Sequence, residues 1–179
     1  RMWAEHVNFY LSQPDLTELQ RMVAESIAVK ERIVAEDPHE HGIRKALNFG
    51  HTIGHALEEF ALQQAGGAVV STAPEKRPLL HGYAVAFGLI GELYMSARKA
   101  GFPTERLHQT ARFIRENYAQ TEFTCNDYPT LLNLMRHDKK NTSGIINFTL
   151  LHNIGDIRIN QTATDEEICE ALDFIREGY

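Results

Sequence analysis

Residues 81–100 read HGYAVAFGLIGELYMSARKA, a stretch that is apolar nearly all round. A helix without a polar face is buried, so we expect this one at the centre of the domain. Gly101, Phe102 and Pro103 then end it. Because its longest apolar run contains Glu92 and is far short of about 20 residues, the stretch does not predict a membrane span. It therefore predicts the core helix of a soluble fold.

The segments around this core helix predict further helices and one hairpin. Apolar residues recur at spacings of three and four in several segments, and Thr164 is a helix N-cap signal. The predicted helices are Asp15 to about Ala35, Pro103 to Tyr118, Tyr128 to His137 and Thr164 to Ile175. The runs IINFTLL (145–151) and IRIN (157–160) predict two short strands, and residues 64–78 predict a surface loop. The predicted fold class is mainly α, with a short C-terminal β-hairpin.

Composition and charge limit the possible functions. With 179 residues and 43% hydrophobic content, the chain fits one domain, residues 1–179, better than two. The net charge of -6 argues against a nucleic-acid partner, because phosphate-backbone binding needs clustered Lys and Arg. Cys125 and Cys169 form no CxxC pair, which favours a reducing cytoplasm. No signal peptide opens the chain, and its abrupt start, RMWAEHVNFYL, favours a fragment of a longer protein.

Residues 42–64, GIRKALNFGHTIGHALEEFALQQ, predict one continuous helix with a polar stripe. Arg44, Asn48, His51 and His55 fall within a sector of about 60° on its surface. Such a stripe is normally apolar and faces a core, whereas this one is cationic and able to bind metal. We therefore expect an anion or a metal ion opposite it. On another face, Gly50 suits the close approach of a neighbouring backbone, as does Gly54.

The histidines are candidate metal ligands. His51 and His55 are one helical turn apart, and His81 stands at the start of the apolar helix. An HxxxH pair also occurs by chance, and a histidine at the start of a helix can simply cap it. Two histidines and a carboxylate would match a catalytic zinc site with one open position. Glu58 and Glu59 could support the ligands or could be solvated surface charges, so the carboxylate is left open.

Positive side chains near the stripe are candidate anion-binding residues. Lys30, Arg44, Lys139 and Lys140 could each bind a phosphate or a carboxylate, and Arg can do so through two hydrogen bonds. A plain surface role is the alternative for each of them.

Three segments together resemble the C-terminal domain of the 3-dehydroquinate synthase family. They are SIAVKERIVAEDPHEHGIRKALNFGHTIGHALEE (26–59), LLHGYAVAFGL (79–89) and MRHDKKNTSGIINFTLL (135–151). Enzymes of this family convert 3-deoxy-arabino-heptulosonate 7-phosphate, a phosphorylated sugar acid, into 3-dehydroquinate and phosphate in the shikimate pathway. They use NAD⁺ and a divalent metal, usually zinc. The resemblance also implies the C-terminal half of a two-domain fold.

The resemblance assigns roles to the candidate residues. His51 and His81 would be metal ligands. Arg44, Asn48, His55 and one of Lys139 or Lys140 would surround the substrate, and Lys30 would hold its carboxylate or a ring hydroxyl.

Compared with the family, we expect this chain to lack the N-terminal NAD-binding domain and the third metal ligand, a glutamate followed three residues later by lysine. Glu5 does not match that motif, because Asn8 stands at the position of the lysine. We therefore expect the isolated chain to be inactive, and the full-length protein to be a cytoplasmic homodimer.

Other functions remain open at this point. One is a related sugar-phosphate cyclase, such as a 2-deoxy-scyllo-inosose synthase, and another is a glycerol-dehydrogenase-like enzyme. A third is a helical interaction module without catalysis, in which the histidines and Arg44 bind a partner. A structural zinc domain is the weakest alternative, because no cysteine lies near the histidines in the sequence.

Overall fold

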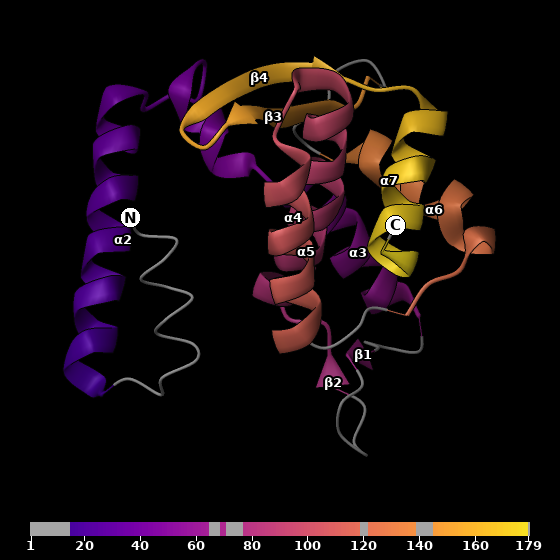
Figure 1. Cartoon of the computed structure of the whole chain (residues 1–179), viewed down its shortest axis with the longest axis horizontal. Helices are drawn as coiled ribbons and strands as arrows, with labels where there is room; N and C mark the ends of the chain where they lie inside the picture. Colours follow the sequence, from indigo (N-terminus) through magenta and orange to yellow (C-terminus); the bar gives the residue numbers. More distant parts are fainter. Residues whose placement is uncertain (1–14, 65–68, 71–76, 119–121, 139–144, 179) are drawn as a thin grey trace. The chain divides into compact units, whose positions relative to one another are not determined.

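The computed structural model describes residues 15–64, 69–70, 77–118, 122–138 and 145–178 (Figure 1). Helices dominate this part of the chain, and one longer antiparallel hairpin precedes the last helix, so the predicted fold class is confirmed. The chain forms two compact units, one up to Leu47 and the other from Asn48 onward. Among the described residues, no helix combines the length and the apolar character that crossing a membrane requires.

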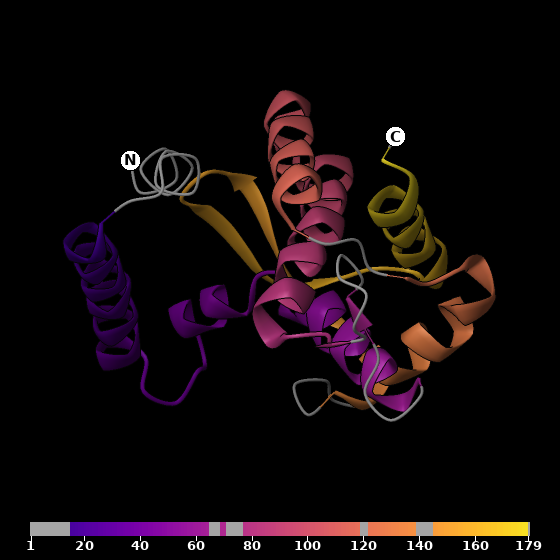
Figure 2. The same ribbon diagram turned by 90° about the horizontal axis from the view of Figure 1, so that it is seen from below.

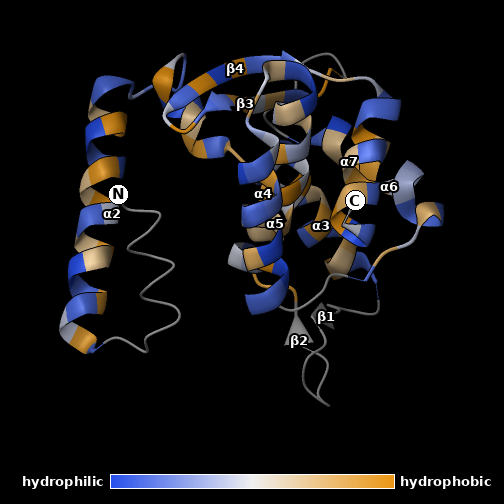
Figure 3. Ribbon diagram, viewed as in Figure 1, coloured by the Kyte–Doolittle hydropathy of each residue, from blue (hydrophilic) through white to orange (hydrophobic). Residues whose placement is uncertain are grey.

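The first unit contains helix α2 (Leu16–Glu36), which matches the predicted helix closely. The Asp15 side chain caps its start by accepting a hydrogen bond from the Glu18 amide, 2.8 Å away. Figure 3 shows hydrophobic residues interspersed with hydrophilic ones along this helix.

Asp37 organises the turn that follows α2. Its carboxylate accepts hydrogen bonds from the amides of Gly42, His41 and Arg44 at 2.7, 3.0 and 3.1 Å. These bonds, that of Gly42 above all, lower the pKa of the Asp37 side chain. The 3₁₀ helix η1 (Ile43–Asn48) begins directly after this turn.

The second unit is built around helix α4 (His81–Met95), which contacts α3 (His51–Gln63), α5 (Thr104–Asn117) and α7 (Asp165–Glu177). Figure 2 shows this arrangement from below. The prediction of a buried core helix is confirmed, since Ala84, Ile90 and Met95 are at most 1% exposed. The helix continues as a π-helical turn, η2 (Ser96–Ala100). Helix α6 (Tyr128–His137) packs on α3 and follows the short 3₁₀ helix η3 (Cys125–Asp127).

The predicted hairpin consists of strands β3 (Asn147–Asn153) and β4 (Asp156–Thr162). The strands are antiparallel, with Asn147 opposite Thr162 and Leu150 opposite Arg158. Two further strands of two residues each, β1 (Val69–Val70) and β2 (Arg77–Pro78), pair within the segment predicted as a loop. Helix α7 begins at the predicted cap, where the side chains of Thr164 and Glu167 each accept a hydrogen bond from the other residue's amide.

The prediction of one continuous helix over residues 42–64 is wrong. The 3₁₀ helix η1 ends at Asn48, and α3 begins at His51. Gly50 between them has a φ of 80°, in the left-handed region that interrupts a right-handed helix and favours glycine. Arg44 and Asn48 therefore lie on a different helix from His51 and His55, and the four residues do not form one stripe.

Glycines allow α3 and α4 to cross closely, as the sequence predicted for Gly50 and Gly54. A Cβ atom on Gly54 would lie 3.0 Å from the Cα atom of Val85, and one on Gly50 would lie 2.8 Å from the Leu89 side chain. A Cβ atom on Gly88 would lie only 1.9 Å from the Gly50 carbonyl oxygen. Because Gly54 faces residues 84–85 and Gly50 faces residue 88, the helices run antiparallel, and α4 starts beside the second turn of α3.

Candidate metal centre

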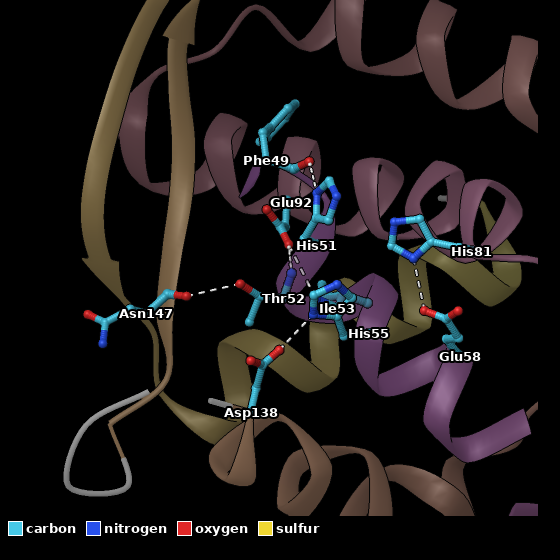
Figure 4. A network of polar contacts seen from close by, with 10 residues as sticks. All are labelled: Phe49, His51, Thr52, Ile53, His55, Glu58, His81, Glu92, Asp138 and Asn147. Carbon is cyan, nitrogen blue, oxygen red and sulfur yellow. Dashed lines mark hydrogen bonds and ion pairs between the residues drawn. The ribbon is translucent and has the colours of Figure 1, made fainter. Parts of the chain in front are cut away.

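Three histidines meet where α4 starts beside α3 (Figure 4). His51 is the first residue of α3, His55 lies one turn later, and His81 is the first residue of α4. One ring nitrogen from each lies within 4.8 Å of the others. The ring centroids are 5.4 Å apart for His51–His55, 5.4 Å for His51–His81 and 5.7 Å for His55–His81. The structure thus brings together all three histidines that the sequence singled out.

Each histidine is oriented by an oxygen atom that contacts its Nδ1. The partner of His51 is the Phe49 carbonyl oxygen at 3.1 Å. His55 contacts Asp138 Oδ2 at 2.8 Å, and His81 contacts Glu58 Oε2 at 2.9 Å. A carbonyl oxygen or an ionised carboxylate can only accept, so in the neutral form of each imidazole this contact assigns the hydrogen to Nδ1 and the lone pair to Nε2.

This donor set fits a divalent transition metal such as zinc. Zinc takes neutral imidazole nitrogens, and its histidine ligands commonly donate their second N–H to a carboxylate or a backbone carbonyl. Here all three imidazoles have such a partner. The side chains of His55 and His81 are 33% and 54% exposed, so solvent or a small molecule can reach the cluster.

A cavity of about 550 Å³ adjoins the cluster along α3 and α6. His55, Glu58 and Asp138 line it and are also part of the histidine network. Leu62 and Leu134 contribute apolar surface to the same cavity. Carboxylates therefore border the histidines on this side.

The two glutamates that the sequence left open are now distinguished. Glu58 orients His81, as a partner of a ligand would. Glu59 also lines the cavity, but it is exposed and accepts a hydrogen bond from the Gln63 side chain at 3.0 Å rather than from a histidine. The sequence predicted no role for Asp138, because its partner His55 lies 83 residues earlier in the chain.

The predicted anion-binding residues belong to the first unit, to the end of η1 or to segments outside the described residues. Arg44 belongs to the first unit, where Nη1 donates to the Pro38 carbonyl at 2.7 Å. Lys30 is exposed on α2, also in the first unit. Asn48 is the last residue of η1. Lys139 and Lys140 fall outside the described residues.

Known proteins share this sequence pattern. A family model for the 3-dehydroquinate synthase C-terminal domain matches residues 2–141. The 3-dehydroquinate synthase of Parabacteroides distasonis is 51% identical over 177 residues, which cover 99% of this chain and 47% of that protein. The enzyme of the same name from Listeria innocua is 36% identical over 154 residues, covering 86% of this chain and 37% of that protein. The chain therefore spans less than half the length of these relatives.

Solved structures share the fold. A 2-deoxy-scyllo-inosose synthase, complexed with carbaglucose-6-phosphate, NAD⁺ and Co²⁺, matches with a TM-score of 0.65 at 24% identity, covering 91% of this chain and 42% of that one. A 2-epi-5-epi-valiolone synthase from Streptomyces hygroscopicus, with NAD⁺ and Zn²⁺ bound, also has a TM-score of 0.65, at 21% identity, covering 92% of this chain and 41% of that one. With the family match over most of its length, the chain belongs to the 3-dehydroquinate synthase family, as its C-terminal domain.

Proposed function

We propose that this chain is the metal- and substrate-binding half of a 3-dehydroquinate synthase, which converts 3-deoxy-arabino-heptulosonate 7-phosphate into 3-dehydroquinate and phosphate in the shikimate pathway. The reaction class is a carbon–oxygen lyase that eliminates phosphate. The observation that carries the proposal is the histidine cluster, with an oxygen partner at each Nδ1. The 51% identity to a 3-dehydroquinate synthase over nearly the whole chain supports it.

His51 and His81 are the proposed metal ligands, each through Nε2. They come from two different helices, so the packing of α3 on α4 sets the distance between them. A third ligand, a glutamate, would come from outside this chain. A divalent metal held there, zinc in the first instance, would polarise the substrate hydroxyl that is oxidised.

His55 is the proposed proton-transfer residue beside the metal. Asp138 binds its Nδ1, which leaves the Nε2 lone pair available to accept a proton from a substrate hydroxyl. The carboxylate also stabilises the imidazolium that this transfer forms, because opposite charges lie 2.8 Å apart.

The remaining roles concern substrate and cofactor binding. Arg44, Asn48, Lys30 and one of Lys139 or Lys140 would bind the phosphate and carboxylate of the substrate. NAD⁺ would bind to an N-terminal domain that is not part of this chain, and the intact protein would act as a cytoplasmic homodimer. The isolated chain is then inactive, because it holds only one part of the site.

A related cyclase is the second candidate, because a 2-deoxy-scyllo-inosose synthase complex shares the fold. The two candidates differ in substrate, a heptulosonate phosphate for the first and a hexose 6-phosphate for the second. Measuring phosphate release by the same protein with each substrate in turn distinguishes the two candidates.

A chimera tests the proposed reaction. This chain replaces the aligned segment of the Parabacteroides distasonis protein, and phosphate release from the heptulosonate phosphate is measured with NAD⁺ and Zn²⁺. We expect release by the chimera and none by the isolated chain. The His51→Ala chimera should be inactive. The Glu59→Gln chimera should be active, because among the residues that the structure describes the exposed Glu59 carboxylate accepts a hydrogen bond only from the Gln63 side chain. No release by a folded chimera would contradict the proposed reaction, and full activity of His51→Ala would favour the interaction module.

A further inference from the structure

Glu92 is a carboxylate in the core of the second unit, with 0% of its surface exposed. It lies on α4, the helix that packs against the start of α3. A buried carboxylate is costly unless hydrogen-bond donors surround it. The sequence singled out Glu92 only as a break in an apolar run, and the proposed reaction assigns it no role.

The carboxylate of Glu92 caps helix α3. Its Oε2 accepts a hydrogen bond from the Gly50 amide at 2.7 Å, and its Oε1 accepts from the amides of Thr52 and Ile53 at 3.0 and 3.3 Å. The N-cap residue of α3 is Gly50, which has no side chain to provide these bonds. A negative charge at this position also interacts favourably with the helix dipole. A side chain of α4 therefore fixes the position of the first turn of α3.

The same contacts bear on the ring of His51. The Gly50 N–H and the Phe49 carbonyl belong to one planar peptide group, in which they point in opposite directions. Glu92 binds the N–H of this group, and His51 Nδ1 contacts its carbonyl oxygen at 3.1 Å. Turning the peptide would break both interactions together. Figure 4 shows the contact between the Phe49 carbonyl oxygen and His51, with the Glu92 carboxylate close by.

We propose that Glu92 is a positioning residue for the metal centre, acting on His51 through the Phe49–Gly50 peptide. Glu92 fixes the plane of that peptide, the Phe49 carbonyl holds the hydrogen on His51 Nδ1, and Nε2 then presents its lone pair to a metal. Glu92 itself contacts no substrate or metal. The metal-binding part of this inference rests on the proposed function, whereas the effect on the His51 tautomer is independent of it.

The test is a Glu92→Gln variant of the chain. Glutamine has one acceptor oxygen and an NH₂ donor, so at least one of the three amides loses its partner. We expect Co²⁺ affinity, measured by competition with a chromophoric chelator, to fall about tenfold or more, in the range found when outer partners of metal ligands are removed. We also expect the imidazole ¹⁵N shifts of metal-free His51 to move away from the Nδ1–H tautomer.

Ser96→Ala is the matched control for lost stability. Ser96 is also fully buried, and its Oγ donates to the Glu92 backbone carbonyl at 2.6 Å and accepts from the Leu151 amide at 3.0 Å. This variant should melt at a lower temperature and keep both the Co²⁺ affinity and the His51 tautomer. If Glu92→Gln does not fold, Glu92→Asp, which keeps the charge on a shorter side chain, should show the same two changes to a smaller degree.

The outcomes separate this inference from the proposed function. Unchanged Co²⁺ affinity and an unchanged His51 tautomer in a folded Glu92 variant would overturn the inference. If His51→Ala and His81→Ala bind Co²⁺ as tightly as the parent chain, the proposed metal site is wrong. If those two variants lose the metal while the Glu92 variant retains it with the parent affinity, only the positioning role of Glu92 is overturned.

Discussion

An added Cβ atom would meet its neighbours more closely at Gly88 than at Gly50 or Gly54, so a Gly88→Ala substitution tests how the metal centre is assembled. The added Cβ atom would lie 1.9 Å from the Gly50 carbonyl oxygen and 2.7 Å from the Gly54 nitrogen. Both are backbone atoms, which cannot rotate away as a side chain can. Since Cβ atoms essentially never come within 3.0 Å of such neighbours, the helices must separate locally by about 1.1 Å (3.0 − 1.9 Å).

This separation has two expected consequences. Overpacking of this kind costs about 1–3 kcal/mol of unfolding free energy, which lowers the melting temperature of a chain of this size by about 2–12 °C. Metal–ligand distances tolerate about 0.2 Å, so moving His51 away from His81 should also weaken Co²⁺ binding by about tenfold or more.

Gly82→Ala is the control, because it adds the same methyl group to the same helix. A Cβ atom on Gly82 has nothing within 4 Å, and alanine is the better helix former. Thermal melts and chelator competition on the two variants should therefore differ clearly. Equal melting temperatures and equal Co²⁺ affinities would refute the reasoning that the glycine contacts set the geometry of the histidine cluster.

Three further predictions concern single side chains. Glu58→Gln should weaken Co²⁺ binding by about 10- to 100-fold, because it removes the charge that orients His81, whereas Glu59→Gln should leave the affinity unchanged; equal loss in both would contradict this. Because folding lowers the pKa of Asp37, its stabilising effect is present above the ordinary Asp value of about 4 and is lost as the pH falls through the lower folded value. In urea unfolding, the parent chain should thus have a higher unfolding free energy than Asp37→Asn at pH 6, and this difference should disappear in acid. A difference that stays constant with pH would contradict the prediction. Thr164→Ala removes the cap of α7 and should cost about 1 kcal/mol, or about 2–4 °C in a thermal melt, and an unchanged melting temperature would exclude that contribution.

Local signals predicted most of the fold. Helix α4 follows from its apolar composition, and the start of α7 follows from Thr164 and Glu167, which are three residues apart. The hairpin follows from β-prone runs on either side of the turn at Gly155. The three histidines could be singled out because a helical turn and a helix start are visible in the sequence.

Long-range contacts account for what the sequence did not predict. The break at Gly50 depends on a left-handed φ and on a hydrogen bond that the Gly50 amide donates to the carboxylate of Glu92, 42 residues later. His55 and Asp138 are 83 residues apart, so their contact could not be read from spacing. Glu58 and Glu59 are adjacent in the sequence, and only the position of His81 distinguishes them.

Anomalous X-ray diffraction at the zinc edge, on crystals of the chain grown with Zn²⁺, tests the central claim most directly. The proposed metal site predicts one strong peak about 2.0–2.1 Å from the Nε2 atoms of His51 and His81. The peak should be absent in the His51→Ala variant and retained in Glu59→Gln. A zinc ion bound elsewhere, or one that remains at His81 at full occupancy after His51 is removed, would contradict the assignment of these two histidines as ligands.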